Sequence, residues 1–468
     1  MLQDAARQPT LTIPATADTI VARLERIPLG PWHIRLASIL GVGTFFDAFD
    51  SLAIGTALTV IVTTFHIGFV QAGLLISAGY VGQFLGAIFF GYLAEKYGRR
   101  PAWLIGTAMF SILSVVAACA WSFNGLLWAR IIEGIGLGAE VPIAGALFNE
   151  YVRSKNRGLV VGVYESLFSW GNMFAPLIGL GLITWLGPNL GWRALLAFGA
   201  IPMIAVIIGY FNLPESARWL TDHGRADEAN AIVDKMEDEA RARGETLAVP
   251  EVRYHADVKP TSFTELFAPA YRMRTFLSWT QAFTVYFITY GFLTWLPTLF
   301  TQIGGLPRNQ ALGLSVLASL ISVVMNYVVA FSIDRVGRKP WFCMSYAFFL
   351  IGAIIAIVAV AVFHQTGWQV LFAASIFVEL GMFQSGSIYL YTPELYPTRM
   401  RAWATSITSS LNRVASFIAP ALVGVLLGAH LGLGSVFAMF GLAALIGLIV
   451  MAIFGIETKQ RVLEDISA

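Results

Sequence analysis

Long apolar runs alternate with short charged loops along the chain. Runs of about 20 apolar residues match the hydrocarbon thickness of a bilayer, so each is predicted to be a membrane-spanning helix. The runs lie near 36–63, 69–93, 102–120, 124–149, 159–186 and 192–212, and then near 276–300, 310–333, 341–363, 368–392, 403–428 and 433–455. The pattern therefore predicts an all-α membrane protein with twelve transmembrane helices in two groups of six.

Polar segments divide the chain into five parts. Within the central polar segment, the charged stretch Arg225 to Arg243 predicts a surface helix, and Pro250 to Pro260 reads as a linker. We expect an N-terminal segment (1–35), a six-helix bundle (36–212), a linker with short helices (213–275), a second six-helix bundle (276–455) and a C-terminal tail (456–468).

Three short motifs occur twice. Gly98-Arg-Arg recurs as Gly337-Arg-Lys, Glu150 with Arg157 recurs as Glu394 with Arg401, and Pro-Glu215-Ser recurs loosely as Ile-Glu457-Thr. The copies are 239, 244 and 242 positions apart. Agreement this close predicts one duplicated unit, so each half of the chain is a six-helix pseudo-repeat.

Composition and charge narrow the class of protein. Of the 468 residues, 57% are hydrophobic and 12% charged, against about 25% charged in soluble domains. A net charge of +2 does not favour nucleic acid. Cys119 and Cys343 lie in apolar runs, so neither a disulfide framework nor a metal site is expected. No phosphate-binding loop and no nucleophile–base pattern occurs, so we expect neither an ATP-driven pump nor an enzyme, and no cofactor.

The loops indicate the orientation. Lys and Arg gather after the second, fourth, eighth and tenth spans, and the opposite loops are nearly free of them. By the positive-inside rule, both termini and the central segment should be cytoplasmic, in a plasma or inner membrane. The N-terminus lacks the pattern of a cleaved signal peptide, so the first span should act as the insertion signal.

Six acidic residues lie inside predicted spans, where an unpaired charge is costly, and five of them are candidate proton carriers: Asp47, Asp50, Glu140, Glu165 and Glu379. The spacing of three puts the two aspartates on one helix face. One of that pair could instead cap or bridge helices. Arg130 and Glu133 are also three apart, and we expect that pair to be structural.

Arg413 stands alone in the eleventh span. Arginine suits bidentate capture of a carboxylate, so it is the main candidate for substrate binding. The alternative is a structural ion pair with Asp47, Glu140, Glu165 or Glu379. The two roles are compatible, because an arginine alternating between substrate and an internal acid would couple the two.

Polar and aromatic residues cluster at mid-depth in four other spans. They offer stacking faces and directional hydrogen bonds to a small planar ligand. Helix packing is the alternative for any one of them. The candidates are Tyr164, Trp170 and Asn172, then Gln281, Tyr286 and Tyr290, then Asn326 and Tyr327, and finally Gln384 and Tyr389.

The repeated loop residues are candidates for a gate. Glycines allow sharp turns and close helix ends, and the charges could pair across helices when that side is shut. Plain positive-inside topology is the alternative. The gate candidates are Gly91, Glu95, Gly98, Arg99, Arg100, Glu150, Arg157, Glu215 and Arg218, with Asp334, Arg335, Gly337, Arg338, Glu394, Arg401 and Glu457.

Several of these motifs resemble the major facilitator superfamily. Gly91-Tyr-Leu-Ala-Glu-Lys-Tyr-Gly-Arg-Arg100 is similar to its loop signature G-x-L-A-D-R-x-G-R-R, with Glu95 where aspartate is usual. Asp334-Arg-Val-Gly-Arg-Lys339 is similar to the second copy, with Ala330 in place of the leading glycine. Pro214-Glu-Ser-Ala-Arg-Trp-Leu220 resembles the branch of sugar porters and organic-ion transporters, and Tyr391-Thr-Pro-Glu-Leu-Tyr-Pro-Thr-Arg-Met-Arg401 resembles the organic-ion side.

The resemblance implies a function. Asp47-Ala-Phe-Asp50 is similar to the D-G-x-D motif of aromatic acid:proton symporters, with Ala48 replacing glycine, and anion transporters of this branch carry arginine where Arg413 stands. Bacterial nicotinate (niacin) transporters are the most similar in this spacing. The implied function is import of a small organic anion, an aromatic monocarboxylate such as nicotinate, by proton symport with alternating access in a monomer. An uncoupled facilitator of organic ions and a non-transporting membrane ligand-binding protein are the rivals.

Overall fold

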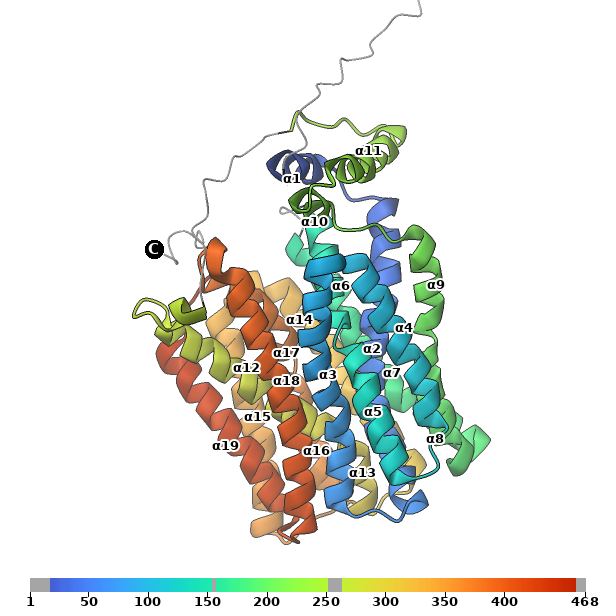
Figure 1. Ribbon diagram of the computed structural model, residues 1–468. Helices are drawn as coiled ribbons and strands as arrows, with labels where there is room; N and C mark the ends of the chain where they lie inside the picture. Colours follow the sequence, from blue (N-terminus) through green and yellow to red (C-terminus); the bar gives the residue numbers. More distant parts are fainter. Residues whose placement is uncertain (1–16, 154–156, 251–262, 460–468) are drawn as a thin grey trace, which may run out of the picture.

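Two helical bundles lie side by side, the first drawn in blue to green and the second in yellow to red (Figure 1). The structure is a computed structural model, and it describes residues 17–153, 157–250 and 263–459. Every regular element in these ranges is a helix. Eleven helical stretches in them are long and apolar enough to cross a membrane, and the bent pair α12–α13 makes a twelfth. The predicted twelve-helix fold is confirmed.

The first bundle holds six spans, two of them interrupted. Span one is longer than predicted because Gly30 and Pro31 form a helix start before the apolar run, with the proline in the first turn. The spans are α2 (Pro31–Thr64), α3 (Phe69–Tyr97), α4 (Arg99–Ala118), α5 with α6 (Phe123–Leu137 and Glu140–Tyr151), α7 (Arg157–Leu186), and α8, η2 and α9 (Pro188–Ala197, Phe198–Ala200 and Pro202–Asn212).

The second bundle repeats this plan, and its first span is bent. The helix axis turns by 43° between Leu293 and Leu296, a break that the apolar pattern did not predict. The spans are α12 with α13 (Arg272–Leu293 and Leu296–Gln302), α14 (Arg308–Val336), α15 (Arg338–Ala361), α16 with α17 (Trp368–Gly381 and Gln384–Glu394), α18 (Thr398–Gly428) and α19 (Gly432–Phe454).

Short helices lie outside the spans, beyond one end of the first bundle (Figure 1). They are α1 (Ala17–Arg26), α10 (Ala217–Asp222) and α11 (Ala226–Ala242), with η3 (Phe263–Phe267) before the second bundle. The predicted surface helix coincides with α11. The predicted linker lies, beyond Pro250, outside the described residues. Because spans alternate in direction, the basic loops after spans two, four, eight and ten share this end, called here the basic end.

Helices α1 and α11 are joined by one buried carboxylate. Glu237 is 2% exposed and accepts hydrogen bonds from Arg23 (3.0 Å) and Arg26 (2.6 Å). Burial alone would raise the pKa of Glu237, but the hydrogen bonds from the two arginines hold it below its ordinary value. Arg35 of α2 pairs with Glu239 of α11 (2.6 Å), and Nε1 of Trp219 in α10 donates to the carbonyl of Glu95 in α3 (2.7 Å). The short helices are thus anchored on the first bundle.

At the end opposite the basic loops, the two bundles touch through backbone. A Cβ atom on Gly73 of α3 would lie 2.7 Å from the carbonyl oxygen of Pro420 and 3.1 Å from Cα of Gly424 in α18. Ser77 donates a hydrogen bond to the carbonyl of Phe417 (2.6 Å) one turn further in. Only glycine permits the first contact, so α3 and α18 are tightly packed at this end.

Candidate functional site

A chain of hydrogen bonds crosses between the bundles at mid-depth. Arg413 of α18 donates through Nη1 to Oε1 of Gln83 in α3. Nε2 of Gln83 donates to Oδ1 of Asp47 (3.3 Å) and to Oγ of Ser51 (3.2 Å), both in α2. All four side chains are buried. No ion pair joins Arg413 to an acid within the described ranges, so the amide stands between the two charges.

Tyrosines surround the arginine. Tyr286, Tyr290 and Tyr389 lie within electrostatic range of the Arg413 guanidinium. The rings of Tyr286 and Tyr290 are 5.6 Å apart, and Tyr80 of α3 meets Tyr290 edge-on at 5.0 Å. A guanidinium among aromatic rings provides a carboxylate partner and stacking faces in one place.

Asp50 belongs to a different cluster from Asp47, although the two share a helix face. Nη1 of Arg130 donates to both carboxylate oxygens of Asp50 (2.9 and 2.8 Å) and to Oε2 of Glu133 (2.8 Å). Ser114 donates to the other Glu133 oxygen (2.6 Å). The charged members are at most 2% exposed. Two carboxylates thus share one guanidinium, and a single proton would balance the charge.

Glu140 begins α6, at the break in span four. Thr44 and Thr107 each donate to its carboxylate at 3.4 Å, and the hydroxyl of Tyr164 lies 2.6 Å from that of Thr44. Glu140 therefore ties spans one, three and four together. Tyr164, a predicted substrate residue, lies in this cluster instead of among the tyrosines around Arg413.

The second bundle has a matching break at Gln384, which begins α17. Its amide donates to Oε1 of Gln281 (2.9 Å). Nearby, the hydroxyls of Thr284 and Tyr346 are 2.7 Å apart. Gln281 and Gln384 are fully buried, so these two predicted substrate residues hydrogen-bond to each other within one bundle.

Three further candidates lie between α7 and α14. The hydroxyl of Tyr327 accepts from Nε1 of Trp170 (3.0 Å) and lies 3.0 Å from that of Ser166. Asn326 donates to Ser169 (2.9 Å). These hydrogen bonds join the two bundles on a face that does not include Arg413.

The remaining candidates are isolated. Glu165 lies within electrostatic range of Asp47 and forms no hydrogen bond with the described residues. Asn172 has a buried amide oxygen without a partner among the described side chains and backbone. Glu379 of α16 is fully buried, and in the described part of the chain neither carboxylate oxygen has a hydrogen-bond partner.

The repeated loop motifs adopt the same geometry twice. Oε1 of Glu215 accepts from the backbone N–H of Arg99 (2.9 Å), and Oε1 of Glu457 accepts from that of Arg338 (3.0 Å). Each arginine also pairs with the glutamate that ends span four or ten, since Arg99–Glu150 and Arg338–Glu394 are both 2.9 Å apart. The preceding glycines, Gly98 and Gly337, have φ of +108° and +111°.

Each of these loop pairs joins residues of one bundle. Asp334 pairs with Arg338 in the same helix (2.7 Å), and Arg401 donates to the carbonyl of Tyr396 (3.1 Å). Glu95 is exposed, and the side chain of Arg157 lies outside the described residues. The ion pairs of Arg99 and of Arg338 therefore stay on one side of the molecule, each with its own bundle. The remaining loop candidates are Gly91, Arg100, Arg218 and Arg335.

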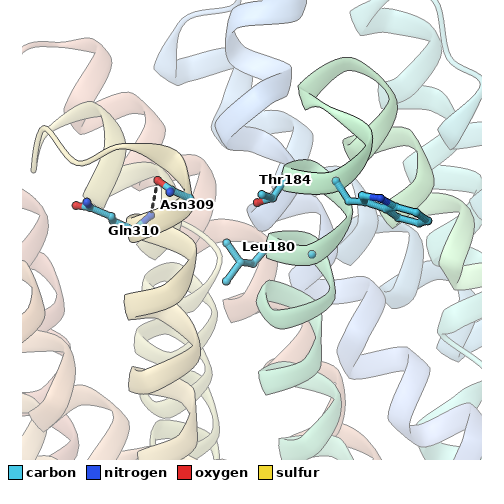
Figure 2. Close-up of a pocket in the computed structure, with 6 residues that line it drawn as sticks. Leu180, Thr184, Asn309 and Gln310 are labelled. Atoms are coloured by element: carbon cyan, nitrogen blue, oxygen red, sulfur yellow. Dashed lines mark hydrogen bonds between the residues drawn. The ribbon is translucent and has the colours of Figure 1, made fainter.

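A groove with a volume of about 610 Å³ lies elsewhere. It is lined by Leu180, Gly181, Thr184, Trp185, Asn309 and Gln310. Figure 2 shows Leu180 and Thr184 on α7 facing α14, where Asn309 lies across from them and the Gln310 side chain points away from α7. None of the buried charges lines it, so it is separate from the Arg413 site.

Sequence reasoning missed Gln83, because an uncharged amide in an apolar run does not stand out. It also missed the partner of Asp50, because Arg130 is 80 positions away. The break at Gln384 could have been found, because 244 positions separate it from Glu140, the offset already known for Glu150 and Glu394.

Comparison with known proteins decides the family. A family model described as sugar (and other) transporter matches residues 39–468. The chain belongs to this family. The transporter is 32% identical to the niacin transporter NiaP of Acinetobacter baylyi, over 96% of this chain and 99% of that protein. It is a membrane transporter of small molecules and is not an enzyme.

Other matches agree. A gallate transporter of Pseudomonas putida is 29% identical over 90% of this chain and 91% of that protein. A putative niacin/nicotinamide transporter of Bacillus subtilis is 27% identical, covering 92% and 98%. The fold matches a partially occluded, inward-open structure of the xylose transporter XylE from E. coli with a TM-score of 0.73 and 16% identity, covering 92% and 100%.

Proposed function

We propose that the transporter imports an aromatic monocarboxylate such as nicotinate together with protons. The observation that carries the proposal is the buried Arg413 guanidinium, surrounded by tyrosines and held by an amide rather than by an acid. A guanidinium with no direct acidic partner is available for a substrate carboxylate. The names of two relatives, a niacin and a gallate transporter, refer to aromatic acids.

Proton coupling is supported by the acids in the first bundle. Asp50 and Glu133 share one arginine in a dry site, and Asp47 connects through Gln83 to Arg413. A buried site with an uncompensated negative charge is costly, and uptake of one proton by a carboxylate neutralises it. Glu140, Glu165 and Glu379 remain further candidates for the proton. The aromatic and polar candidates other than the tyrosines around Arg413 are proposed to shape the cavity and the contact between bundles.

For orientation, we propose that the basic end faces the cytoplasm, in a bacterial inner membrane, with both termini on that side. The repeated loop pairs would then hold the cytoplasmic helix ends of each bundle in register while the bundles rock about the site. Both sides of the Arg413 site come from one chain, which is compatible with a monomer.

Uptake into proteoliposomes tests the proposal. Labelled nicotinate, benzoate and an organic cation are offered with and without an inward proton gradient. We expect the two acids to be concentrated only with the gradient and the cation to be excluded. Arg413→Ala should abolish uptake, whereas Arg225→Ala on the surface helix α11 should not change it.

Each other outcome points to a rival. Uptake that equilibrates without responding to the gradient identifies a facilitator. Saturable binding without flux identifies a non-transporting ligand-binding protein. Carriage of the cation, with Arg413→Ala still active, would refute the anion site.

A further inference from the structure

Gln83 is the single side chain that touches both the proposed anion site and an acid of the proton site within the described residues. We infer that its amide couples the two: substrate capture by Arg413 and protonation of Asp47 each change a hydrogen bond of this one side chain. This rests on the proposed function. It assigns a positioning role to a residue that has no charge and does not itself need to touch substrate.

The chemistry of the two neighbours fixes which way the amide points. A guanidinium has only donors, and an ionised carboxylate has only acceptors. A group placed between them must accept on one side and donate on the other, as Gln83 does toward Arg413 and Asp47. A glutamate there would repel Asp47, a lysine would repel Arg413, and a leucine would leave both neighbours without this partner.

The backbone beneath the amide is fixed. A Cβ atom on Gly82 would lie 2.8 Å from Cα of Gly134, so α3 and α5 pack backbone to backbone at this level. Two of the three hydrogen bonds of Gln83 go to α2 in its own bundle, and one goes to Arg413 in the other. The bond to Arg413 is therefore the one that changes when the bundles move.

The coupling follows from charge. A substrate carboxylate on Arg413 replaces the amide oxygen as acceptor and adds one negative charge to the site. A proton on Asp47 removes one negative charge and turns one of its two acceptor oxygens into a donor, so the carboxyl no longer holds the amide in one orientation. Each event therefore favours the other, and one proton per monocarboxylate keeps the site neutral. The groups within electrostatic range of Asp47 are Asp50, Arg413, Tyr80, Tyr290, Glu140 and Glu165.

Two assays on purified transporter in liposomes separate binding from coupling. The first is exchange of labelled for unlabelled nicotinate at equal pH on both sides. The second is accumulation driven by an inward proton gradient, with a trapped pH dye to count protons per nicotinate. Gln83→Leu should retain exchange and lose roughly tenfold or more in accumulation, within the range of ordinary coupling energies. Gln365→Leu, at an exposed loop position, is the matched control.

The variant Gln83→Glu distinguishes a coupling role of Gln83 from a purely structural one. A protonated glutamic acid presents a carbonyl acceptor and an O–H donor, as the amide does. Accumulation by this variant should be lost at neutral pH and recovered at acidic pH, while the wild type and Gln365→Leu show no such reversal. The readout also remains if the leucine variant fails to fold.

The outcomes are distinct. Unchanged accumulation and proton count in Gln83→Leu would overturn the inference, and so would loss of exchange together with a Glu variant that stays inactive at every pH. If the wild type concentrates none of the acids, or if Arg413→Ala still does, the proposed function itself fails.

Discussion

Span four breaks at Glu140, and span ten breaks at Gln384, 244 positions later. At both breaks a buried side chain hydrogen-bonds to neighbouring spans: Glu140 accepts from Thr44 and Thr107, whereas the amide of Gln384 donates to Gln281. The first bundle has an acid where the second has an amide. An uncharged side chain is therefore sufficient at such a break, as Gln384 shows. The negative charge of Glu140 is not needed for the fold that the two bundles share.

The same contrast extends to the rest of the interior. The first bundle contains Asp47 beside Gln83, and Asp50 and Glu133 beside Arg130, whereas the second contributes Arg413. At the basic end, by contrast, the two bundles have matching pairs with matching distances. Duplication has therefore kept the loops alike while the charges inside the bundles have diverged.

The largest effect should come from removing the shared cation of the first bundle. Arg130→Leu leaves Asp50 and Glu133 buried without their guanidinium, and breaking such a pair costs about 3–5 kcal/mol. We expect poor yield and early thermal unfolding in detergent, measured by the loss of monodisperse protein on heating. Arg225→Leu removes an exposed ion pair with Glu228 of α11. It should lower the free energy of unfolding by about 1 kcal/mol or less. Equal stability of both variants would contradict the prediction.

Exchanging the two groups at the breaks tests the comparison directly. Gln384→Glu places an added acid in a fully buried site and should destabilise the protein by about 1–3 kcal/mol at neutral pH. Glu140→Gln copies the second bundle and should fold normally. Thermal unfolding of both variants across pH measures this. If Glu140→Gln folds but no longer concentrates nicotinate, Glu140 is a proton carrier as well as a tie between spans.

The repeated turns should respond equally. Alanine at Gly98 or at Gly337 forces a side chain into a positive-φ conformation and toward the capping glutamate. Each substitution should cost about 1–2 kcal/mol, and the two losses should agree within error. Thermal unfolding of the two single variants, with Gly145→Ala at an open helical position as control, checks this. Clearly unequal losses would show that the two loops contribute differently to stability.

The smallest effect is expected at α1. Among the described elements, this helix lies on the first bundle and has no counterpart on the second. Because the pKa of Glu237 is lowered in the folded protein, its contribution is complete above the ordinary glutamate value of about 4.3 and is lost as pH falls below it. Hydrogen exchange of α1 should therefore rise in acid. Glu237→Gln should raise it already at neutral pH, with Glu228→Gln on the exposed face as control. Equal exchange in the two variants would contradict this role.

Sequence patterns captured what is periodic or local. Apolar runs identified the spans, α11 appeared as a charged stretch, and Arg130 with Glu133 followed from helical spacing. The bend after Leu293 could not be predicted from the pattern, because the apolar run continues through it. The mutual pairing of Gln281 and Gln384 was equally hidden, because a mid-span amide looks the same whether it faces a cavity or a neighbouring helix.

Side-chain partners across bundles were beyond the sequence for a different reason. Asp47 and Asp50 share one helix face, yet one faces α3 and the other α5. Which helix each aspartate meets depends on how the helices pack, and Gly82 brings α3 and α5 backbone to backbone at this level. Periodicity gives the face of a helix, and only packing gives the neighbour.

The glycine contact of α3 and α18 has a mechanical consequence. Gly424 lies eleven residues from Arg413 along one helix, a lever of roughly 16 Å at 1.5 Å per residue. If that backbone contact is the fulcrum, a turn of roughly 10° carries the guanidinium about 3 Å, more than a hydrogen bond tolerates. A hinge without side chains at one end would thus make and break a single bond at the centre.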